Sequence, residues 1–144
     1  MKVLRINSND THHIRKLLLR NEYPKKECVF ERDDDDLSFH LGGFQEGKLV
    51  SIASFYFERH SDFPQENQFR LRGMATLPEY QKQGMGSALI RTAFPMIKQN
   101  QAELLWCNAR VSAQPFYQKL DFQISGDPFE IEDVGTHQLM FKEL

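Results

Sequence analysis

The sequence predicts an α/β (α+β) fold in which a mixed twisted sheet of about six or seven strands is flanked by helices. Its second half alternates strand, helix, strand, helix and strand, which is typical of a partly parallel sheet with helices on its faces. Its first half contains a hairpin signal, because two apolar segments meet at a tight turn. With 144 residues and 40% hydrophobic content, the chain has the usual size of one domain with its own core. We therefore expect a single domain over residues 1–144.

The first half of the chain is expected to hold a strand, a helix and the hairpin. Residues 3–6 indicate a short strand, and either Asp10 or Thr11 can cap a helix whose isoleucine and leucines recur at helical spacing. Residues 38–46 and 48–58 indicate two strands around a Gln-Glu-Gly-Lys turn. This hairpin makes the first part of the sheet antiparallel.

Three further elements are expected in the middle of the chain. Residues 67–76 indicate a strand with Gly73 at its centre, where glycine usually marks a bulge or a close backbone approach. Apolar residues at spacings of three and four predict a helix over roughly 85–100. Pro95 should kink this helix or loosen its last turn, because proline removes one backbone hydrogen bond. The short apolar segment 103–108 fits a buried strand.

A short helix and two strands complete the predicted fold. Ser112 is expected to cap the helix, and Pro115 is tolerated because it falls in the first helical turn. Strands near 122–125 and over 136–143 close the chain. The helix thus lies between strands, as expected for a helix that covers one face of a sheet.

Charge and composition exclude several classes of protein. The formal net charge is -2, from 18 basic and 20 acidic residues, which is atypical of proteins that bind nucleic acid or an anionic membrane. The N-terminus lacks the apolar stretch of a signal peptide, and the longest apolar-rich run, residues 49–57, is too short to span a bilayer. We expect a cytoplasmic protein in which Cys28 and Cys107 stay reduced. No metal site is expected, since the adjacent His12 and His13 cannot face one ion together.

Residues 33–36, four consecutive aspartates, are the biased segment of the sequence. Neighbouring carboxylates repel one another and hydrate well, so a solvated loop is the favoured interpretation. A rim that attracts a cationic substrate is the alternative.

The segment 77–90, LPEYQKQGMGSALI, joins the strand predicted at 67–76 to the helix that follows. The first backbone N–H groups of a helix lack intrahelical partners and lie at the positive end of the helix dipole. Gly84 and Gly86 would let a phosphate approach this backbone. Side chains that can add hydrogen-bond donors are those of Gln81, Lys82, Gln83 and Ser87. The pattern therefore predicts a pyrophosphate site.

These glycines follow the spacing of a known signature. The pattern is neither G-x-G-x-x-G nor G-x-x-x-x-G-K-[ST], which disfavours a dinucleotide-binding fold and a P-loop. Residues 81–86, QKQGMG, resemble the [QR]-x-x-G-x-[GA] signature of the GNAT superfamily of acyl-CoA-dependent N-acetyltransferases. The preceding GMATLPEYQ resembles the strand and proline loop that lead into that signature in the family.

A second segment strengthens the resemblance. NARVSA at 108–113 and FYQKLDF at 116–122 are similar to the GNAT segment in which a small helix carries a tyrosine before a K-L-G-F-like ending. The resemblance covers about 67–125, with a narrower likeness of WCNAR and GTHQLM to a small uncharacterised bacterial-type branch. Arg110 stands where the family often has asparagine, so an asparagine-specific contact cannot be carried over. Asp121 replaces a common glycine, and aspartate tolerates the left-handed conformation needed after a helix.

The GNAT resemblance implies a splayed sheet and a cofactor. Two parallel central strands, about 69–76 and 103–109, are expected to separate, with Gly73 placing the bulge that opens them. The pantetheine arm of acetyl-CoA would bond to the first strand, and an N–H near Met74 would polarise the thioester carbonyl. The diphosphate would bind at 81–87. The implied cofactor-binding residues are Met74, Ala75, Thr76, Gln81, Lys82, Gln83, Gly84, Met85, Gly86, Ser87, Arg110 and Phe116.

The resemblance also implies an N-acetyltransferase in which a neutral primary amine, of a small molecule or of a protein or peptide, attacks acetyl-CoA directly in a ternary complex. Tyr117 matches the usual general acid of the family, since a phenol with a pKa of about 10 is protonated at neutral pH. An alkylammonium must lose its proton, at about 4 to 5 kcal/mol at pH 7, and His137 is the first candidate for the base. Asn108 would orient a substrate or a water. Packing roles are the alternatives for Tyr117 and His137.

Two other functions stay open at the level of the sequence. One is a non-catalytic acyl-CoA binding or sensing module with the same fold, and the other is a protein in which 81–87 bind a different phosphate ligand. Tyr117 and His137 favour the enzyme over the module. The protein is expected to be a monomer or a homodimer.

The amine acceptor is not specified by any motif. GNAT proteins vary their acceptor sites in the loops before the cofactor strand, here 20–37 and 58–67. Glu22, Glu27 and the aspartate run would favour a cationic acceptor, whereas Arg70 and Arg72 would favour an acidic one.

Overall fold

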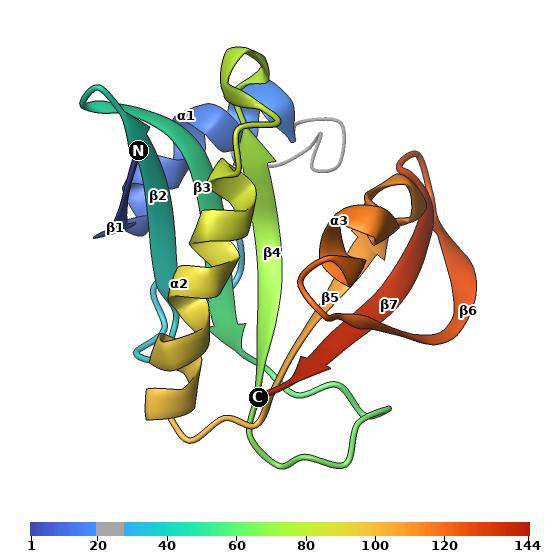
Figure 1. Ribbon diagram of the computed structural model, residues 1–144. Coiled ribbons are helices and arrows are strands. Elements are labelled where there is room, and N and C mark those ends of the chain that lie inside the picture. The colour runs from blue at the N-terminus through green and yellow to red at the C-terminus, as the bar shows by residue number, and fades with distance from the viewer. Residues whose placement is uncertain (20–27) are drawn as a thin grey trace.

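The computed structural model describes residues 1–19 and 28–144, which form a mixed sheet with helices on both faces (Figure 1). In this part of the chain the strands are β1 (Lys2–Ile6), β2 (Phe39–Gln45), β3 (Lys48–Phe57), β4 (Gln68–Thr76), β5 (Leu104–Arg110), β6 (Gln123–Ile131) and β7 (Gly135–Glu143). The helices are α1 (Ser8–Leu18), α2 (Met85–Gln99) and α3 (Gln114–Gln118). The strand order is β1-β2-β3-β4-β5-β7-β6, and among the described strands β4 and β5 are the parallel pair. The predicted fold class is confirmed.

The hairpin of β2 and β3 forms where the sequence predicts it. Gln45 pairs with Lys48 across the turn, and both residues between them have left-handed backbones, with φ of 50° at Glu46 and 80° at Gly47. Such values at both central positions match the twist of the two strands. The hairpin therefore fixes the register of the antiparallel part of the sheet.

A bulge interrupts the pairing of β3 with β4. Ser54 pairs with Arg72, whereas Ile52 pairs with Ala75, so that Gly73 and Met74 together stand opposite one residue of β3. Gly73 has φ of 63°, a backbone conformation that residues with a side chain rarely adopt. The bulge predicted at Gly73 is confirmed.

The parallel pair separates beyond its first residues. β4 and β5 are in register from Gln68 with Leu104 to Arg70 with Trp106, and their pairing ends there. β4 continues to Thr76 and β5 to Arg110, and the two strands diverge in Figure 1. The predicted splay between the central strands is present.

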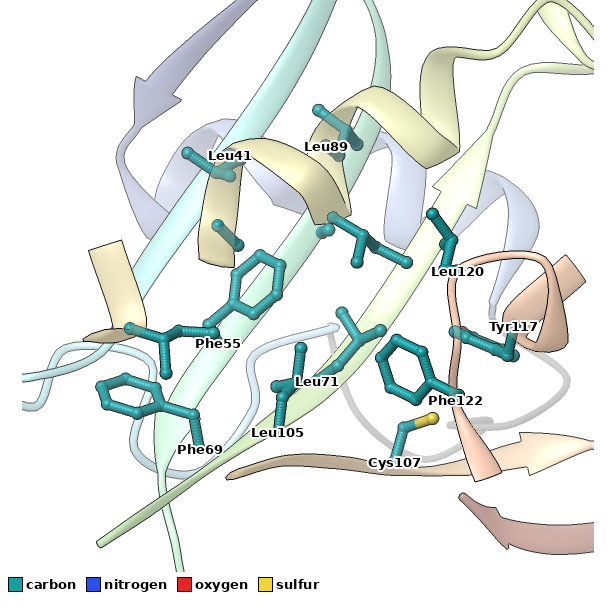
Figure 2. Close-up of a cluster of buried hydrophobic side chains, with 14 of the residues drawn as sticks. Leu41, Phe55, Phe69, Leu71, Leu89, Leu105, Cys107, Tyr117, Leu120 and Phe122 are labelled. Atoms are coloured by element: carbon teal, nitrogen blue, oxygen red, sulfur yellow. The ribbon is translucent and has the colours of Figure 1, made fainter. Parts of the chain in front are cut away.

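The main core lies between α2 and the sheet. Figure 2 shows it extending from Leu41 and Phe55 beneath α2 to Leu120 and Phe122 beside β5. Side chains of β3 alternate between the faces: Phe55 joins this core, while its neighbours Ser54 and Tyr56 hydrogen-bond to α1 on the opposite face (Figure 1). The face of the sheet toward α1 therefore carries hydrogen-bonding side chains, whereas the face toward α2 carries the apolar core.

The helix starts differ from the sequence prediction. Asn7, and neither Asp10 nor Thr11, is the N-cap of α1, and Asp10 instead accepts a 3.0 Å hydrogen bond from the Asn7 N–H. Both residue types suit a helix start, so the pattern alone misplaced the cap by one turn. Ser112 does not cap α3, because it lies inside a 3₁₀ turn over Val111–Ala113 that precedes the helix.

The ends of α2 and β6 in the structure can also be compared with the sequence prediction. α2 continues past Pro95 to Gln99, and the missing proline N–H does not end the helix early. β6 runs to Ile131, well beyond the four residues predicted, with a register shift between Ser125 and Phe129. After α3, Asp121 has φ of 67°, the left-handed conformation expected there.

The aspartate run is only partly a solvated loop. Asp33 is buried, with 5% of its surface exposed, and its carboxylate is paired with Arg15, whereas Asp34 to Asp36 are exposed. The prediction was wrong for Asp33, because sequence neighbours do not show a buried partner 18 positions away. Glu22 and Glu27 lie outside the described residues.

Cys28 and Cys107 are both free and buried. Among residues 1–19 and 28–144, no helix is both long and apolar enough to cross a membrane.

Candidate active site

Two cavities open where β4 and β5 separate. The α1-side cavity, of about 560 Å³, is bounded by the end of α1, the second half of β4, the end of β5 and the β6–β7 turn. The α2-side cavity, of about 890 Å³, is bounded by the start of α2, the loop before it and α3. The walls that both cavities share contain Met74, Ala75, Thr76, Gln81, Ala113 and Tyr117. The open edge of β4 is therefore reachable from both sides.

The N-terminus of α2 faces the α2-side cavity. Gly84 is its N-cap, with φ of 82°, and its carbonyl accepts the N–H of Ala88 at 3.0 Å. The N–H groups of the first helical turn have no intrahelical acceptor and lie at the positive end of the helix dipole. Lys82, which also has a left-handed backbone (φ 62°), lines the same cavity. This end of the cavity therefore presents backbone N–H groups and a cationic side chain.

The two glycines of the loop act for different reasons. An added Cβ at Gly84 would meet nothing within 4 Å, so Gly84 serves the left-handed turn and leaves open space. At Gly86 an added Cβ would lie 2.8 Å from Met74 Cε and 3.4 Å from Phe116 Cζ. Gly86 therefore lets β4 and α3 pack closely against α2. The sequence predicted only that it lets a phosphate approach the backbone.

Ten of the predicted cofactor-binding residues line the α2-side cavity: Met74, Ala75, Thr76, Gln81, Lys82, Gly84, Met85, Gly86, Ser87 and Phe116. The side-chain amide of Gln81 donates to the Thr76 carbonyl at 3.0 Å, which closes the loop against the end of β4. Gln83 is exposed, lines neither cavity, and donates to the Glu79 carbonyl at 3.4 Å. The Met85 side chain is buried in the core, so its backbone is the part that can serve a ligand.

Five residues that line the α2-side cavity were not predicted as site residues: Tyr80, Ser112, Ala113, Lys119 and Leu120. Lys119 adds a second cationic side chain to the α2-side cavity, beside Lys82. Its position in the FYQKLDF segment was visible, but a lysine on a short helix gives no signal that it turns toward a cavity.

The α1-side cavity brings together Asn108, Tyr117 and His137, the three predicted catalytic residues. Arg110 also lines this cavity and is absent from the wall of the other, although it was predicted to bind the cofactor. The register of β5 with β7 explains this placement, because Arg110 stands directly opposite His137.

Tyr117 lies at the junction of the two cavities. Its side chain is buried, with its ring 5.0 Å from that of Phe116. The Phe122 ring lies 5.3 Å away on the core side (Figure 2). Its hydroxyl lies 3.9 Å from Met74 Sδ. Burial raises the pKa of the neighbouring Cys107 thiol to about 12, although Arg70 and Tyr117 act in the opposite direction. The thiol therefore stays protonated at neutral pH.

The ring of His137 is held in one tautomer. Its Nδ1 lies 2.9 Å from the carbonyl oxygen of Gly135, and a carbonyl only accepts, so Nδ1 carries the proton. In the neutral ring Nε2 then keeps its lone pair. His137 is 5% exposed and lines the α1-side cavity.

The loop over 58–67 contributes no described residue to either cavity wall, contrary to expectation. It precedes β4 and therefore lies at the paired end of the strands, away from the splay (Figure 1). The buried Gln68 side chain fixes this loop: it accepts from the His60 N–H at 2.7 Å and donates to the carbonyl of Gln65 at 2.8 Å. The α1-side cavity is instead bounded by residues without a sequence signal, namely Leu18, Leu19, Ile131 and Val134.

Comparison with known proteins agrees with this geometry. The model of the acetyltransferase (GNAT) family matches residues 8–122. The chain is 38% identical over 144 residues to the uncharacterized N-acetyltransferase YitI of Bacillus subtilis (strain 168), a match that covers 100% of this chain and 97% of that protein.

Solved structures show the same fold at low sequence identity. Escherichia coli ElaA superimposes with a TM-score of 0.78 at 14% identity, covering 99% of both chains. A putative N-acetyltransferase from Lactobacillus plantarum gives 0.77 at 17% identity, covering 99% of this chain and 97% of that one. An aminoglycoside 6'-N-acetyltransferase complexed with coenzyme A gives 0.77 at 12% identity, with the same coverage. The family model covers most of the sequence and the match to the bacterial relative covers all of this chain, so the predicted family and enzyme class are confirmed. The chain belongs to the acetyltransferase (GNAT) family.

Proposed function

We propose that the protein, as a single domain over residues 1–144, transfers the acetyl group of acetyl-CoA to a primary amine by direct attack in a ternary complex. The observation that carries this proposal is the position of Tyr117, which lines both cavities where β4 and β5 separate. A proton donor at that junction can reach a thioester on one side and an amine on the other.

The α2-side cavity suits acetyl-CoA. The first turn of α2 offers N–H groups to the diphosphate, and Lys82 and Lys119 add positive charge. The edge of β4 beyond Arg70 is not paired with β5 and is available to bond to the pantetheine arm. Coenzyme A bound to the aminoglycoside 6'-N-acetyltransferase of the same fold supports this choice of cosubstrate.

The reaction then needs three proton transfers. Nε2 of His137, or a water held by Asn108, takes the proton of the incoming ammonium. The amine nitrogen bonds to the thioester carbon while a backbone N–H near Met74 stabilises the carbonyl oxygen. The bond between that carbon and sulfur breaks as the Tyr117 hydroxyl gives its proton to the leaving thiolate, and the extra proton on the nitrogen passes to the Tyr117 phenolate. The products are a neutral amide and CoA, and Tyr117 is again protonated.

The wall of the α1-side cavity favours an acceptor that carries an anionic group beside its amine. Its described residues include Arg70, Arg72 and Arg110 but neither aspartate nor glutamate, and Arg70 is paired with Glu58 at 3.0 Å outside this wall. Asp33, one of the four aspartates of the possible acidic rim, does not line this cavity and is paired with Arg15. A wall of this sign attracts carboxylates and phosphates and repels polycations.

Calorimetry and thiol release test these proposals together. We expect acetyl-CoA and CoA to bind and ATP to give no heat. Release of CoA should be faster with O-phosphoethanolamine than with ethanolamine, which differs from it only by the phosphate. Binding without thiol release from any amine would favour the non-catalytic module, and preferential binding of ATP would favour a different phosphate ligand.

The role of Tyr117 has its own test. Replacement Tyr117→Phe should lower kcat by about 10² to 10³-fold while the affinity for acetyl-CoA changes by less than about twofold. An equal loss of turnover and affinity would show that the tyrosine only positions the ligand.

The free thiols of Cys28 and Cys107 support a reducing, cytoplasmic compartment. A monomer or a homodimer is the expected assembly, and sedimentation of the purified protein with and without CoA distinguishes them.

A further inference from the structure

A buried guanidinium lies beneath the bulge of β4. Arg15 of α1 has 0% of its surface exposed. Its two terminal nitrogens donate to the carboxylate of Asp33, at 2.7 Å and 3.0 Å, and one of them also reaches the Cys28 carbonyl at 3.0 Å. The other donates to Ser54 Oγ at 2.8 Å and to Tyr56 Oη at 3.2 Å. The group is therefore fixed from α1, from β3 and from the segment before β2.

Asp33 is fixed as firmly as its partner. Its carboxylate accepts the Tyr56 hydroxyl at 2.5 Å and the Phe30 N–H at 2.9 Å, and its carbonyl lies 2.8 Å from His40 Nε2. Burial acts to raise the pKa of Asp33, but the hydrogen bonds from Arg15, Tyr56 and Phe30 outweigh it and lower the pKa below 3.8. The carboxylate is thus charged at neutral pH, and the guanidinium cannot shift without breaking several bonds.

The ring of Phe30 connects this group to the bulge. Arg15 Cζ lies 3.8 Å from the centre of the Phe30 ring. A Cβ added at Gly73 would lie 2.8 Å from Phe30 Cε2 and 3.5 Å from Arg15 Nε, so the backbone of the bulge rests directly on this stack. Arg72 Cζ lies 4.7 Å from the same ring, and Arg72 lines the α1-side cavity.

We propose that Arg15 and Phe30 are positioning residues of the acetyltransferase site, which hold the bulge of β4 and the guanidinium of Arg72 in the geometry that binds the acceptor. A buried ion pair is a weak source of net stability, because the desolvation of its charges offsets their attraction. Such a pair does fix geometry, and the group that it fixes here is the ring on which Gly73 and Arg72 rest. A cation over an aromatic face also restricts the orientation of that ring.

The test compares substitutions of Phe30 with the same kind of substitution at a second buried phenylalanine, Phe39. Phe30→Leu keeps an apolar side chain and removes the ring face, and Phe30→Met repeats the change with a more flexible chain. Phe39→Leu is the matched control, because Phe39 is also 3% exposed and lines neither cavity. This expectation rests on the proposed function: Phe30→Leu should raise the KM for O-phosphoethanolamine by roughly tenfold, while the KM for acetyl-CoA stays within about twofold. Phe39→Leu should lower Tm without moving either KM.

A spectroscopic arm does not depend on turnover. In ¹⁵N–¹H spectra the Nε–H signal of Arg72, assigned by its loss in Arg72→Lys, should move downfield in Phe30→Leu, since the ring current is removed, and stay in place in Phe39→Leu. An unmoved signal, or equal effects of both substitutions on both KM values, overturns the inference. A wild-type protein without turnover would contradict the proposed function, whereas the Arg72 signal would still decide the positioning role.

Discussion

Asp33→Asn tests whether the buried carboxylate compensates the charge of Arg15. The side chains of this pair are 3% and 0% exposed, so its loss leaves a guanidinium that water cannot reach. Removal of one partner of such a pair costs about 3 to 5 kcal/mol. For 144 residues, an unfolding entropy of about 2.1 cal/mol/K per residue gives roughly 0.3 kcal/mol/K. We therefore expect Tm to fall by about 10 to 17 °C.

The assay is urea unfolding at neutral pH, supported by calorimetry, with a second ion pair as control. Glu58 and Arg70 are joined at 3.0 Å, but their side chains are 25% and 22% exposed. Glu58→Gln should therefore cost about 1 kcal/mol or less. The double substitution Arg15→Met with Asp33→Asn should be less unstable than Asp33→Asn alone, because no uncompensated charge remains. If Asp33→Asn costs no more than Glu58→Gln, or if the two single changes simply add, the reasoning is refuted.

Three further outcomes are expected. His137→Gln should lower kcat by about 10²-fold with unchanged binding of acetyl-CoA in calorimetry, and a loss confined to binding would remove its role as base. Gly86→Leu, whose side chain would press on Met74, should weaken acetyl-CoA binding more than Gly84→Ala does. The methyl added at Gly84 meets open space, and its left-handed backbone costs about 1 to 2 kcal/mol of conformational energy. The reverse order of affinities in calorimetry would contradict the packing role of Gly86. Burial lowers the pKa of His40 below 6.5 although the Asp33 carbonyl opposes it, so the unfolded chain binds the proton first. Stability should fall as pH drops below 6.5, and His40→Gln should remove this step from a series of Tm values measured between pH 8 and pH 4.

The parts of the fold that follow from local chemistry were predictable. The turn at Glu46 and Gly47, the bulge at Gly73 and the start of α2 at Gly84 each need a left-handed residue, and their sequences show it. The signature at 81–86 then identified the family from neighbouring residues alone.

The parts that depend on distant partners were not predictable. Asp33 looks like one of several hydrated aspartates, and its burial depends on Arg15 and Tyr56, which the sequence places 18 and 23 positions away. Ile131 and Val134 reach the α1-side cavity because β7 pairs with both β5 and β6. The spacing of apolar residues in the sequence does not indicate this strand order. Long-range pairing therefore decides the wall of the α1-side cavity, whereas local motifs decide much of the wall of the α2-side cavity.

The two edges of β4 explain how one strand can serve both cavities. On one edge, pairing with β3 continues past the bulge to Thr76, while on the other, pairing with β5 ends at Arg70. Beyond Arg70 the strand is thus paired on one edge, and its other edge presents backbone N–H groups that a ligand can bond. The bulge turns these groups relative to the pleat, and the Phe30 ring below Gly73 limits how far they can move. Changes beneath the bulge should therefore alter catalysis, whereas changes in the 58–67 loop, at the paired end of β4, should alter stability alone.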